Sequence, residues 1–489
     1  MKRLGDAGSL GGEDDVKRLK EELARQQGDL NKSFLEFCSK TDPLANWVDA
    51  MRDYEQYSVE IASRYNEGVS STDGGALYSF GSGDCGQLGH GVSDPPVEEE
   101  ETVVVRPKKI KAFANAKNIR LIVCGGLTNG VVDSKGLWTW GCADDGALGR
   151  EGDENLPTLV SFPFKIIVTD VAFGESHGTC VSLSGQAFLW GAYRDKEGKT
   201  FFPTTATVEG DGKQSGSGTI SKRPMELKGI SNIVACSSGA NHTLYLTGEG
   251  DVYSLGLGEQ NQLGRRVSTK FKIPHPTDKD AEDVYDVTML HREHLSPQKI
   301  SLNIGSIRSI GCGAYHSFVI SSVRFRVHGC GLNQYRQIAA VERDQLEWTH
   351  LTDLDGKHVS FIRGGEHYSV ALAADGSLYT WGRADQGQLG RNADEKAGSF
   401  DGVPGKVSGL PPIASVYPAS SHVLAVTRTG FVYSWGFGEM LQLGHGETEP
   451  DSGMGADQRL PKKIDFFKDG HVYRVSAGAQ HSCVLVGKQ

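Results

Sequence analysis

The sequence contains no long apolar run. No stretch approaches the ~20 apolar residues that a membrane-spanning helix needs, and the first residues lack the apolar core of a secretory signal peptide. The nine cysteines are scattered and never form a C-x-x-C pair. Several of them, such as Cys124, Cys180 and Cys312, stand in apolar runs, which is typical of small core residues in a reducing compartment. We therefore expect a soluble, intracellular protein with no membrane association.

The chain also lacks an excess of positive charge. Its formal net charge is −10, which argues against a protein that holds nucleic acid through overall charge, although a local basic face stays open. Near the N-terminus, Lys2-Arg3 and Lys17-Arg18 alternate with Asp6, Glu13, Asp14 and Asp15. Such a mixed segment is mostly a solvated helix face, so the sequence shows no basic tail for chromatin or for nuclear import.

Motifs of covalent catalysis are missing as well. The sequence has no G-x-S-x-G elbow, no H-E-x-x-H pair and no G-x-x-x-x-G-K-[ST] phosphate loop. We therefore expect no catalytic residue, no bound metal or other cofactor and no small-molecule substrate.

Glycine, in contrast, is abundant. It accounts for 63 of 489 residues, nearly twice the usual ~7%, and indicates many tight turns between short strands. Much of it lies in a repeated segment: an apolar or aromatic pair, a glycine, a polar stretch and often Leu-Gly. The pivotal glycines are assigned as Gly81, Gly141, Gly191, Gly256, Gly329, Gly382 and Gly436.

A second signature recurs at the same period and reads Gly-x-x-His or close to it, followed by an apolar run. Its histidines are assigned as His177, His242, His316, His367, His422 and His481, with Thr128 in the first copy. With one histidine in each repeat, the set is too dispersed for a tetrahedral metal site. We expect each histidine to bond a neighbouring turn, with a few exposed on one face.

The two signatures together predict an all-β protein, a seven-bladed β-propeller over residues 75–489. An apolar run, a glycine-containing turn and an alternating run form a β-hairpin, and closing a ring of such sheets leaves only short edges. The aromatic residues before the pivotal glycines are expected to pack between blades: Trp140, Trp190, Trp381 and Trp435. An open β-solenoid is the competing architecture.

The first 74 residues follow another pattern. Apolar residues recur at helical spacing from Val16 to Phe37 and again from Leu44 to Tyr65. Between them, Asp42-Pro43 matches a helix N-cap followed by proline at the first helical position. The pattern predicts a helical N-terminal extension over residues 1–74, a hairpin that docks on the propeller or binds a partner.

The two signatures resemble those of the regulator of chromosome condensation family, whose founder is the guanine-nucleotide exchange factor of the small GTPase Ran. The resemblance spans residues 75–489 and is most specific at Cys142–Arg150, Gly258–Arg266 and Phe188–Gly198. In the last stretch the Leu-Gly is missing and the sequence RDKEGKTFF takes its place. In the family this departure corresponds to a protruding β-wedge that presses on the nucleotide site of the GTPase.

The resemblance also implies GTPase-contacting residues on one rim of the propeller. Asp84 matches an acidic contact position, and Glu175 stands where the family pattern has aspartate. Asn241 and Arg336 depart from the pattern, which has aspartate and histidine there. The implied GTPase-binding set is Asp84, Glu175, Arg194, Asp195, Lys196, Glu197, Gly198, Asn241, Arg265, Arg336, His367 and His481.

The function implied is exchange of GDP for GTP on Ran in the nucleus, in support of nucleocytoplasmic transport and mitosis, with chromatin as a further partner. A propeller scaffold without exchange activity, or an exchange factor for another small GTPase, are the alternatives. Taken singly, the carboxylates of Asp84 and Glu175 could satisfy turn amides, and Arg194 and Arg265 could bridge blades through backbone carbonyls. The exchange hypothesis requires Asp84, Glu175, Arg194 and Arg265 on the same face as the wedge.

Overall fold

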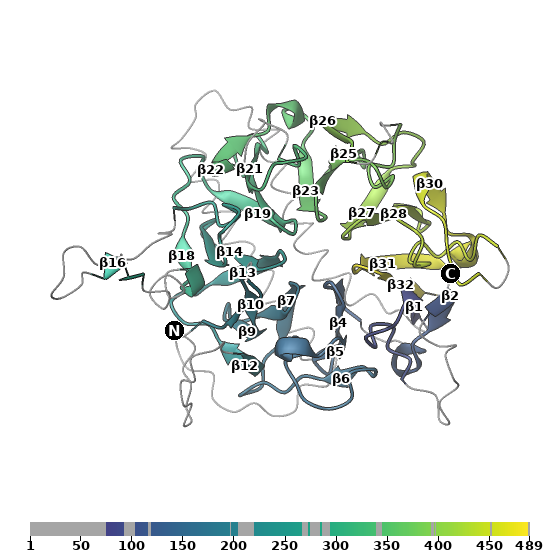
Figure 1. Cartoon of the computed structure of the whole chain (residues 1–489), viewed down its shortest axis with the longest axis horizontal. Coiled ribbons are helices and arrows are strands. Elements are labelled where there is room, and N and C mark those ends of the chain that lie inside the picture. Colours follow the sequence, from purple (N-terminus) through teal and green to yellow (C-terminus); the bar gives the residue numbers. More distant parts are fainter. Residues whose placement is uncertain are drawn as a thin grey trace, which may run out of the picture. The chain divides into compact units, whose positions relative to one another are not determined.

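The computed structural model describes residues 75–91, 103–115, 119–195, 197–203, 220–266, 272–273, 284–285, 294–338, 345–392, 396, 398–449 and 452–487. Within these residues, seven four-stranded antiparallel sheets form a ring, with two small hairpins beside them (Figure 1). The prediction of a seven-bladed β-propeller is confirmed. The predicted helical extension, residues 1–74, lies outside the described residues.

The blades are numbered in chain order from the innermost strand outward. Blade 1 consists of β3 (Leu121–Cys124), β4 (Thr128–Val132), β5 (Leu137–Gly141) and β6 (Thr158–Leu159). Blade 2 consists of β7 (Val168–Phe173), β8 (His177–Ser182), β9 (Ala187–Gly191) and β12 (Ser221–Glu226). Blade 3 consists of β13 (Ile233–Ser238), β14 (His242–Thr247), β15 (Val252–Gly256) and β18 (Gln298–Lys299). Blade 4 consists of β19 (Ile307–Cys312), β20 (His316–Ser321), β21 (Val327–Gly331) and β22 (Gln345–His350). Blade 5 consists of β23 (Val359–Gly364), β24 (Tyr368–Ala373), β25 (Leu378–Arg383) and β26 (Phe400–Lys406). Blade 6 consists of β27 (Ile413–Pro418), β28 (His422–Thr427), β29 (Val432–Gly436) and β30 (Gln458–Lys463). Blade 7 is β31 (His471–Ala477), β32 (His481–Gly487), β1 (Ala76–Ser82) and β2 (Val103–Lys109). The two hairpins are β10 (Tyr193–Arg194) with β11 (Thr200–Phe201) and β16 (Lys272–Ile273) with β17 (Val284–Tyr285), and the 3₁₀ helices are η1 (Lys111–Phe113), η2 (Asp144–Gly146), η3 (Thr352–Leu354) and η4 (Asp465–Phe467).

The second strand of each blade explains why the repeat contains an apolar run. Strands such as β14 and β28 are buried at every position, because neighbouring blades cover both faces of the sheet. The fourth strands lie at the periphery of the ring (Figure 1), and β12 and β30 are accordingly half exposed. The long apolar stretch of each repeat therefore marks the middle of a blade.

Blade 7 closes the ring by combining the first two and the last two described strands of the chain. β1 pairs with β32 from Ala76 opposite Val486 to Gly81 opposite His481, so the first described strand completes the sheet begun by the last two. Because of this pairing, β1 and β32 leave no unpaired edge toward each other where the ring begins and ends.

The pivotal glycine ends the third strand, where its left-handed φ and close contacts exclude a side chain. At Gly141, φ is +107°, and a Cβ would lie 2.2 Å from the carbonyl oxygen of Leu127. In blade 4 this position belongs to Gly331, with φ +110°, which pairs with His316. The assignment of Gly329 was wrong by two residues, because the sequence VHGCG offers two glycines at the end of the strand.

The four tryptophans lie between blades, as predicted. Trp140, Trp190, Trp381 and Trp435 are each at most 1% exposed. The indole N–H of each donates to a carbonyl oxygen in the Leu-Gly loop of the preceding blade: Trp140 to Gln87, Trp190 to Ala147, Trp381 to Gln337 and Trp435 to Gln388, at 2.8–3.1 Å. The same loops bring glycine against the ring; a Cβ on Gly149 would lie 2.9 Å from Trp190. The aromatic residue at the start of the glycine motif in one blade therefore packs against the Leu-Gly end of the motif in the preceding blade.

The histidine signature requires one correction. In five blades, a histidine pairs with the pivotal glycine of the next strand, as His242 does with Gly256, and Thr128 takes this place in blade 1. In blade 5 the position is occupied by Tyr368, which pairs with Gly382. His367 precedes it by one residue, so it belongs to the turn and not to the buried series.

The buried histidines join each blade to the next through side chains. Nε2 of each lies 2.7–3.1 Å from a polar side chain of the following blade: His177 from Thr243, His242 from Ser317, His316 from Ser369, His422 from Ser482 and His481 from Asn129. Where the following blade offers only Gly178 or Val423, the preceding blade has Thr128 or Tyr368 in place of histidine. The partner is therefore a strand side chain of the next blade rather than the predicted turn.

Candidate functional site

One face of the propeller carries the loops that follow the first and the third strand of each blade. Successive strands of a blade run antiparallel, so these two loops project to the same side, here called the loop face. Asp84 follows β1, Glu175 follows β7, Arg194 follows β9 and Arg265 follows β15. All four residues that the exchange hypothesis requires on one face lie in loops of the loop face.

The irregular segment of the third copy forms a hairpin on this face. β10 and β11 pair Tyr193 with Phe201 and Arg194 with Thr200. At its turn, the Asp195 carboxylate accepts from the amides of Glu197 and Lys199 at 2.9 Å, and Gly198 has a φ of +80° with no neighbour within 4 Å of its Cβ position. Lys196 lies outside the described residues. The departure from the repeat therefore builds an exposed two-stranded projection, here called the wedge.

The core between blades 2 and 3 holds the base of the wedge. The Tyr193 side chain is fully buried; its hydroxyl lies 3.0 Å from Oγ1 of Thr243, and its ring centroid lies 4.1 Å from that of His177. Phe202, directly after β11, is 6% exposed and packs in the same core cluster. The wedge is thus fixed at both strands to the rigid part of the propeller.

A polar network surrounds the base and brings together three predicted residues. The Arg194 backbone N–H donates to Oδ1 of Asn241 at 2.8 Å, and the Asn241 amide donates to Oε2 of Glu175 at 3.2 Å. The Arg194 guanidinium donates to Oδ2 of Asp145 at 2.6 Å. Asp145, a residue of η2 in blade 1, was not predicted; its only sequence signal is the extra acidic residue of the motif CADDGALG.

A second cluster on the loop face contains His367. Its ring stacks on Tyr315 with centroids 6.0 Å apart, lies 5.0 Å from the ring centroid of Tyr335, and has Nε2 at 3.5 Å from Oε1 of Glu366. Burial lowers the pKa of His367, and burial together with the nearby carboxylates of Glu366 and Glu175 raises the pKa of Tyr315. Tyr315 therefore connects this cluster to Glu175 of the wedge network.

Neither Tyr315 nor Tyr335 was predicted, although the signature could have revealed both. Tyr315 occupies the residue before a buried histidine, where the other copies have small or polar side chains, and Tyr335 is the aromatic residue of the loop GLNQYRQIA. Arg383 packs over the Tyr335 ring at 5.5 Å and donates to both carboxylate oxygens of Asp385, at 2.8 and 2.9 Å.

The histidine at position 481 does not lie on the rim. Its side chain is fully buried, and Nε2 lies 2.7 Å from Oδ1 of Asn129 in blade 1. The expectation of a rim histidine at this position was wrong, because the residue belongs to the buried series that joins neighbouring blades.

The side chain of Arg265 turns away from the loop face into its own blade. Nε donates to Oγ of Ser254 in β15 at 3.1 Å, and Nη2 donates to the carbonyl oxygen of His294 at 3.3 Å. Arg150 and Arg391, which also follow a Leu-Gly, bond Thr139 and Thr380 in the same way. Arg265 therefore joins the third strand to the outer part of its own blade, whereas the structural alternative had expected a bridge between blades.

Asp84 and Arg336 lie on the loop face, apart from the wedge network. Asp84 is exposed in blade 7 and accepts a 2.9 Å hydrogen bond from Oγ of Ser82. Arg336 adopts a left-handed φ of +55°, at the loop position where three of the blades have glycine, and its guanidinium packs 5.6 Å from the Phe400 ring centroid.

The described loops of this face carry mainly negative charge. Their acidic side chains are Asp84, Asp144, Asp145, Glu151, Asp153, Glu154, Glu175, Asp195, Glu197, Glu259, Glu366, Asp385, Glu439, Glu447, Glu449 and Asp457. The basic side chains among them are fewer: Arg150, Arg194, Lys199, Arg265, Arg266, Arg336, Arg391 and Lys396, with Arg383 at the end of β25. A protein surface that binds here gains most from a positive potential.

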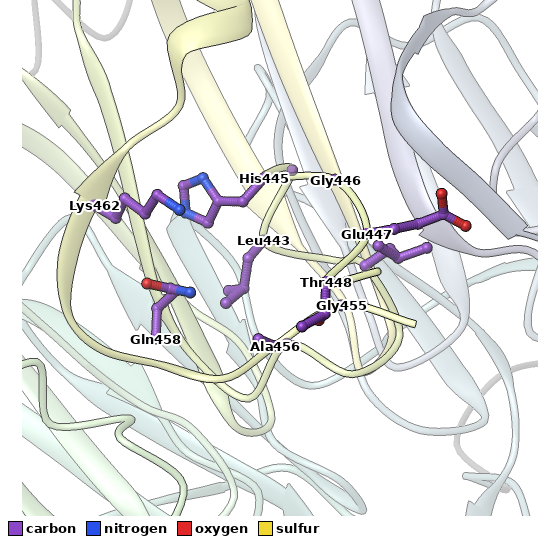
Figure 2. A pocket seen from close by; sticks show the side chains of 12 residues that line it. Leu443, His445, Gly446, Glu447, Thr448, Gly455, Ala456, Gln458 and Lys462 are labelled. Atoms are coloured by element: carbon purple, nitrogen blue, oxygen red, sulfur yellow. The ribbon is translucent and has the colours of Figure 1, made fainter. Parts of the chain in front are cut away.

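A cavity of about 210 Å³ lies in the loop of blade 6, lined by residues that include Leu443, His445, Gln458 and Lys462 (Figure 2). Burial lowers the pKa of His445 to about 4, so this imidazole is neutral at physiological pH. None of the helices in the described residues is long and apolar enough to cross a membrane.

Comparison with known proteins places this fold in a family. A family described as RCC1-like domain matches residues 76–484. The regulator of chromosome condensation of Homo sapiens is 31% identical over 430 residues, which cover 85% of this chain and 91% of that protein. The Saccharomyces cerevisiae protein named guanine nucleotide exchange factor SRM1 is 27% identical and is covered over 85% of its length, with 84% of this chain.

A solved structure agrees with these sequence matches. The crystal structure of Prp20p from Saccharomyces cerevisiae, reported with its binding properties to Gsp1p and histones, superposes with a TM-score of 0.70 at 26% identity. The superposition covers 85% of this chain and 92% of that one. Fold, repeat signatures and relatives agree, and the chain belongs to the regulator of chromosome condensation family, the RCC1-like propellers that include guanine-nucleotide exchange factors.

Proposed function

We propose that the protein is a guanine-nucleotide exchange factor for the small GTPase Ran, and that the GTPase binds the loop face against the wedge. The observation that carries the proposal is the network of Arg194, Asp145, Asn241 and Glu175, which holds an exposed hairpin on a rigid base. Such a preformed projection has no packing role within the propeller, since the Gly198 Cβ position has no neighbour within 4 Å.

Exchange requires no covalent chemistry from the protein. A small GTPase holds its nucleotide through a phosphate loop, a lysine and Mg²⁺, and an exchange factor promotes release by binding the nucleotide-free state more tightly than the loaded one. This coupling is reciprocal, so GTP in turn expels the factor. The residues of the wedge and its base need only a fixed geometry, because any movement of the wedge would weaken its differential contact with the two states of the GTPase.

The two departures beside the wedge base compensate each other. The family pattern has aspartate at both positions, whereas here a longer carboxylate, Glu175, accepts from the amide of Asn241. An aspartate at position 241 would place a second carboxylate beside Glu175 and would lose this donor. With glutamate at position 175 and asparagine at position 241, the site therefore retains one negative charge and the hydrogen bond from the Arg194 backbone N–H.

The acidic loop face fits a basic surface of the GTPase, and the relatives support Ran as that GTPase, the nucleus as the location and chromatin as a further partner. The Prp20p structure was reported with binding to Gsp1p and histones, and several relatives are named for chromosome condensation. Arg336 and His367 are proposed as secondary contacts, because both lie on the loop face within the adjacent aromatic cluster or beside it.

The test is the release of a fluorescent GDP analogue from purified Ran. The wild-type chain is compared with a variant in which residues 194–198 are replaced by a short Gly-Ser turn, and with Glu249→Gln, which removes an exposed charge from the opposite face of blade 3. Release that is accelerated at least ~10-fold by wild type and by Glu249→Gln but not by the wedge variant supports the proposal; ~10-fold corresponds to about 1.4 kcal/mol.

The opposite results separate the alternatives. If folded wild type leaves GDP release from Ran at the spontaneous rate, Ran is excluded as the substrate GTPase. A panel of other small GTPases then distinguishes an exchange factor for another GTPase from a scaffold. Acceleration that survives replacement of the wedge would contradict the assigned role of the hairpin.

A further inference from the structure

The joint between blade 7 and blade 1 contains a cluster of soft donor atoms that no other described joint has. Sγ of Cys124, Sγ of Cys483 and a ring nitrogen of His481 all lie within 4.8 Å of one another. The three residues are 3%, 2% and 0% exposed. This is the one group of three potential metal ligands found among the described residues.

We propose that Cys124, His481 and Cys483 bind a zinc ion that joins the first blade to the last. Two thiolates and an imidazole are ligands that zinc prefers, and two thiolate charges neutralise the divalent ion, which permits burial. Binding releases the two thiol protons to solvent, so the site remains electrically neutral. The proposal is independent of the proposed exchange function.

The surroundings of the cluster supply what a metal site needs besides its ligands. Oδ1 of Asn129 lies 2.7 Å from Nε2 of His481 and 3.7 Å from Sγ of Cys483, and so offers a fourth, oxygen donor. The backbone of Cys124 is fixed on both sides, since its N–H donates to Oγ of Ser476 at 2.8 Å and its carbonyl accepts from the Tyr417 hydroxyl at 2.7 Å. Such outer hydrogen bonds orient the ligands.

The joint between blades 3 and 4 is an internal comparison. Cys312 occupies the position of Cys124, and its N–H likewise donates to a serine of the preceding blade, Ser237. His242 corresponds to His481, but Leu244 stands where blade 7 has Cys483. The joint between blades 3 and 4 therefore has one cysteine and one histidine at the positions where the joint between blades 7 and 1 has two cysteines and one histidine.

The geometry favours a metal over a disulfide. The sulfurs of a tetrahedral zinc site, with Zn–S distances of ~2.3 Å, lie ~3.8 Å apart. Cys124 and Cys483 are both free thiols, and the 4.8 Å within which their sulfurs lie is compatible with this separation. A disulfide would require the sulfurs of two separate blades to approach to ~2.05 Å. Because residue 124 and residues 481 and 483 meet only when the ring closes, bound metal stabilises the closed ring over the open one.

The experiment uses the full-length chain, without affinity tag and purified with reductant but without chelator. Zinc per chain is measured by mass spectrometry for wild type, for Cys124→Ser and for Cys312→Ser, the matched control in the equivalent buried position. We expect about one zinc in wild type and Cys312→Ser and less than ~0.1 in Cys124→Ser. Circular dichroism establishes that each variant is folded.

Cobalt substitution of the wild type needs no variant and covers the case in which Cys124→Ser fails to fold. A thiolate-to-cobalt charge-transfer band in the folded protein supports the site. A reduced wild-type chain that takes up neither zinc nor cobalt on refolding overturns the proposal. So does the recovery of a Cys124–Cys483 disulfide in peptides mapped from non-reduced protein.

Discussion

At the scale of single residues, the histidines determine how neighbouring blades are joined. His242 and Ser317 are both fully buried and lie 2.8 Å apart, and the serine hydroxyl donates onward to the Gln262 carbonyl oxygen. The pairing fails where the following blade has no polar side chain, and there the preceding blade has no histidine. The contact therefore depends on both partners, and its energy is measurable as a coupling.

Replacing His242 and Ser317 by alanine should destabilise the protein in a non-additive way. Each single change should lower the free energy of unfolding by about 2–4 kcal/mol, through a cavity or an unsatisfied buried group. Urea unfolding of the singles and the double variant should give a coupling of at least ~0.5 kcal/mol. His367→Ala, at a partly exposed histidine outside the series, should cost less than either of these single changes. Additive effects would show that the two side chains do not interact.

The same histidines predict loss of stability in mild acid. Burial lowers the pKa of His177, His242, His316 and His422 to about 3. The unfolded chain, with histidine pKa values of ~6.5, therefore binds more protons than the folded chain below that pH. The stability contributed by these neutral histidines is complete above pH ~6.5 and falls as the pH drops toward 3.

Each such histidine should reduce the free energy of unfolding by about 1.4 kcal/mol per pH unit below ~6.5. Urea unfolding over a pH series measures the slope, and His242→Gln should reduce it by about one proton. A slope that is the same in this variant and in wild type would contradict a neutral, buried His242.

At the scale of structural elements, the wedge depends on a support from the neighbouring blade. The Arg194 guanidinium is bound to Asp145 of η2, whose side chain is 15% exposed, so the hairpin is fixed to blade 1 as well as to blades 2 and 3. A partly buried, charge-assisted hydrogen bond of this kind orients an element more than it stabilises the fold.

Asp145→Asn should therefore loosen the wedge while the propeller stays folded. We expect a change in the free energy of unfolding of at most about 1–2 kcal/mol, faster amide hydrogen exchange in the hairpin, and at least ~10-fold slower nucleotide exchange if the proposed function holds. Glu249→Gln, which removes an exposed carboxylate from the opposite face, is the control and should change neither rate. Unchanged hydrogen exchange in Asp145→Asn would show that the wedge does not depend on this contact.

At the scale of the whole molecule, stability depends on the closure of the ring. β32 pairs with β1 on one side and β31 on the other, and its residues Val484 and Leu485 are at most 1% exposed. Without β32, β31 and β1 would each present an unpaired edge, and each buried apolar side chain lost would cost about 1.5–3 kcal/mol.

Ending the chain at Ala479 should abolish the cooperative unfolding of the propeller. Total stabilities of ~5–15 kcal/mol do not survive the loss of a strand buried on both faces. Thermal circular dichroism and size-exclusion chromatography measure the effect, with a chain that ends at Gly487 as the control. A native-like transition in the shorter chain would mean that closure contributes little.

The sequence by itself determined the architecture and the place of the wedge. Seven copies of two signatures define seven sheets, because an apolar run covered by blades on both sides and a glycine at left-handed φ leave few alternatives. The break in the copy around Arg194 marked a departure from the repeat, and the resemblance to the family implied that this departure is a wedge.

Only the tertiary structure decided which side chains meet. Two glycines two residues apart made Gly329 and Gly331 indistinguishable until strand pairing selected Gly331, and a shift of one residue placed His367 on the loop face and Tyr368 in the core. Likewise, Asp145 reaches Arg194 and Cys124 reaches Cys483 across blade boundaries. A local sequence pattern specifies the conformation of each blade, but contacts between blades depend on ring closure, which brings together residues distant in the chain.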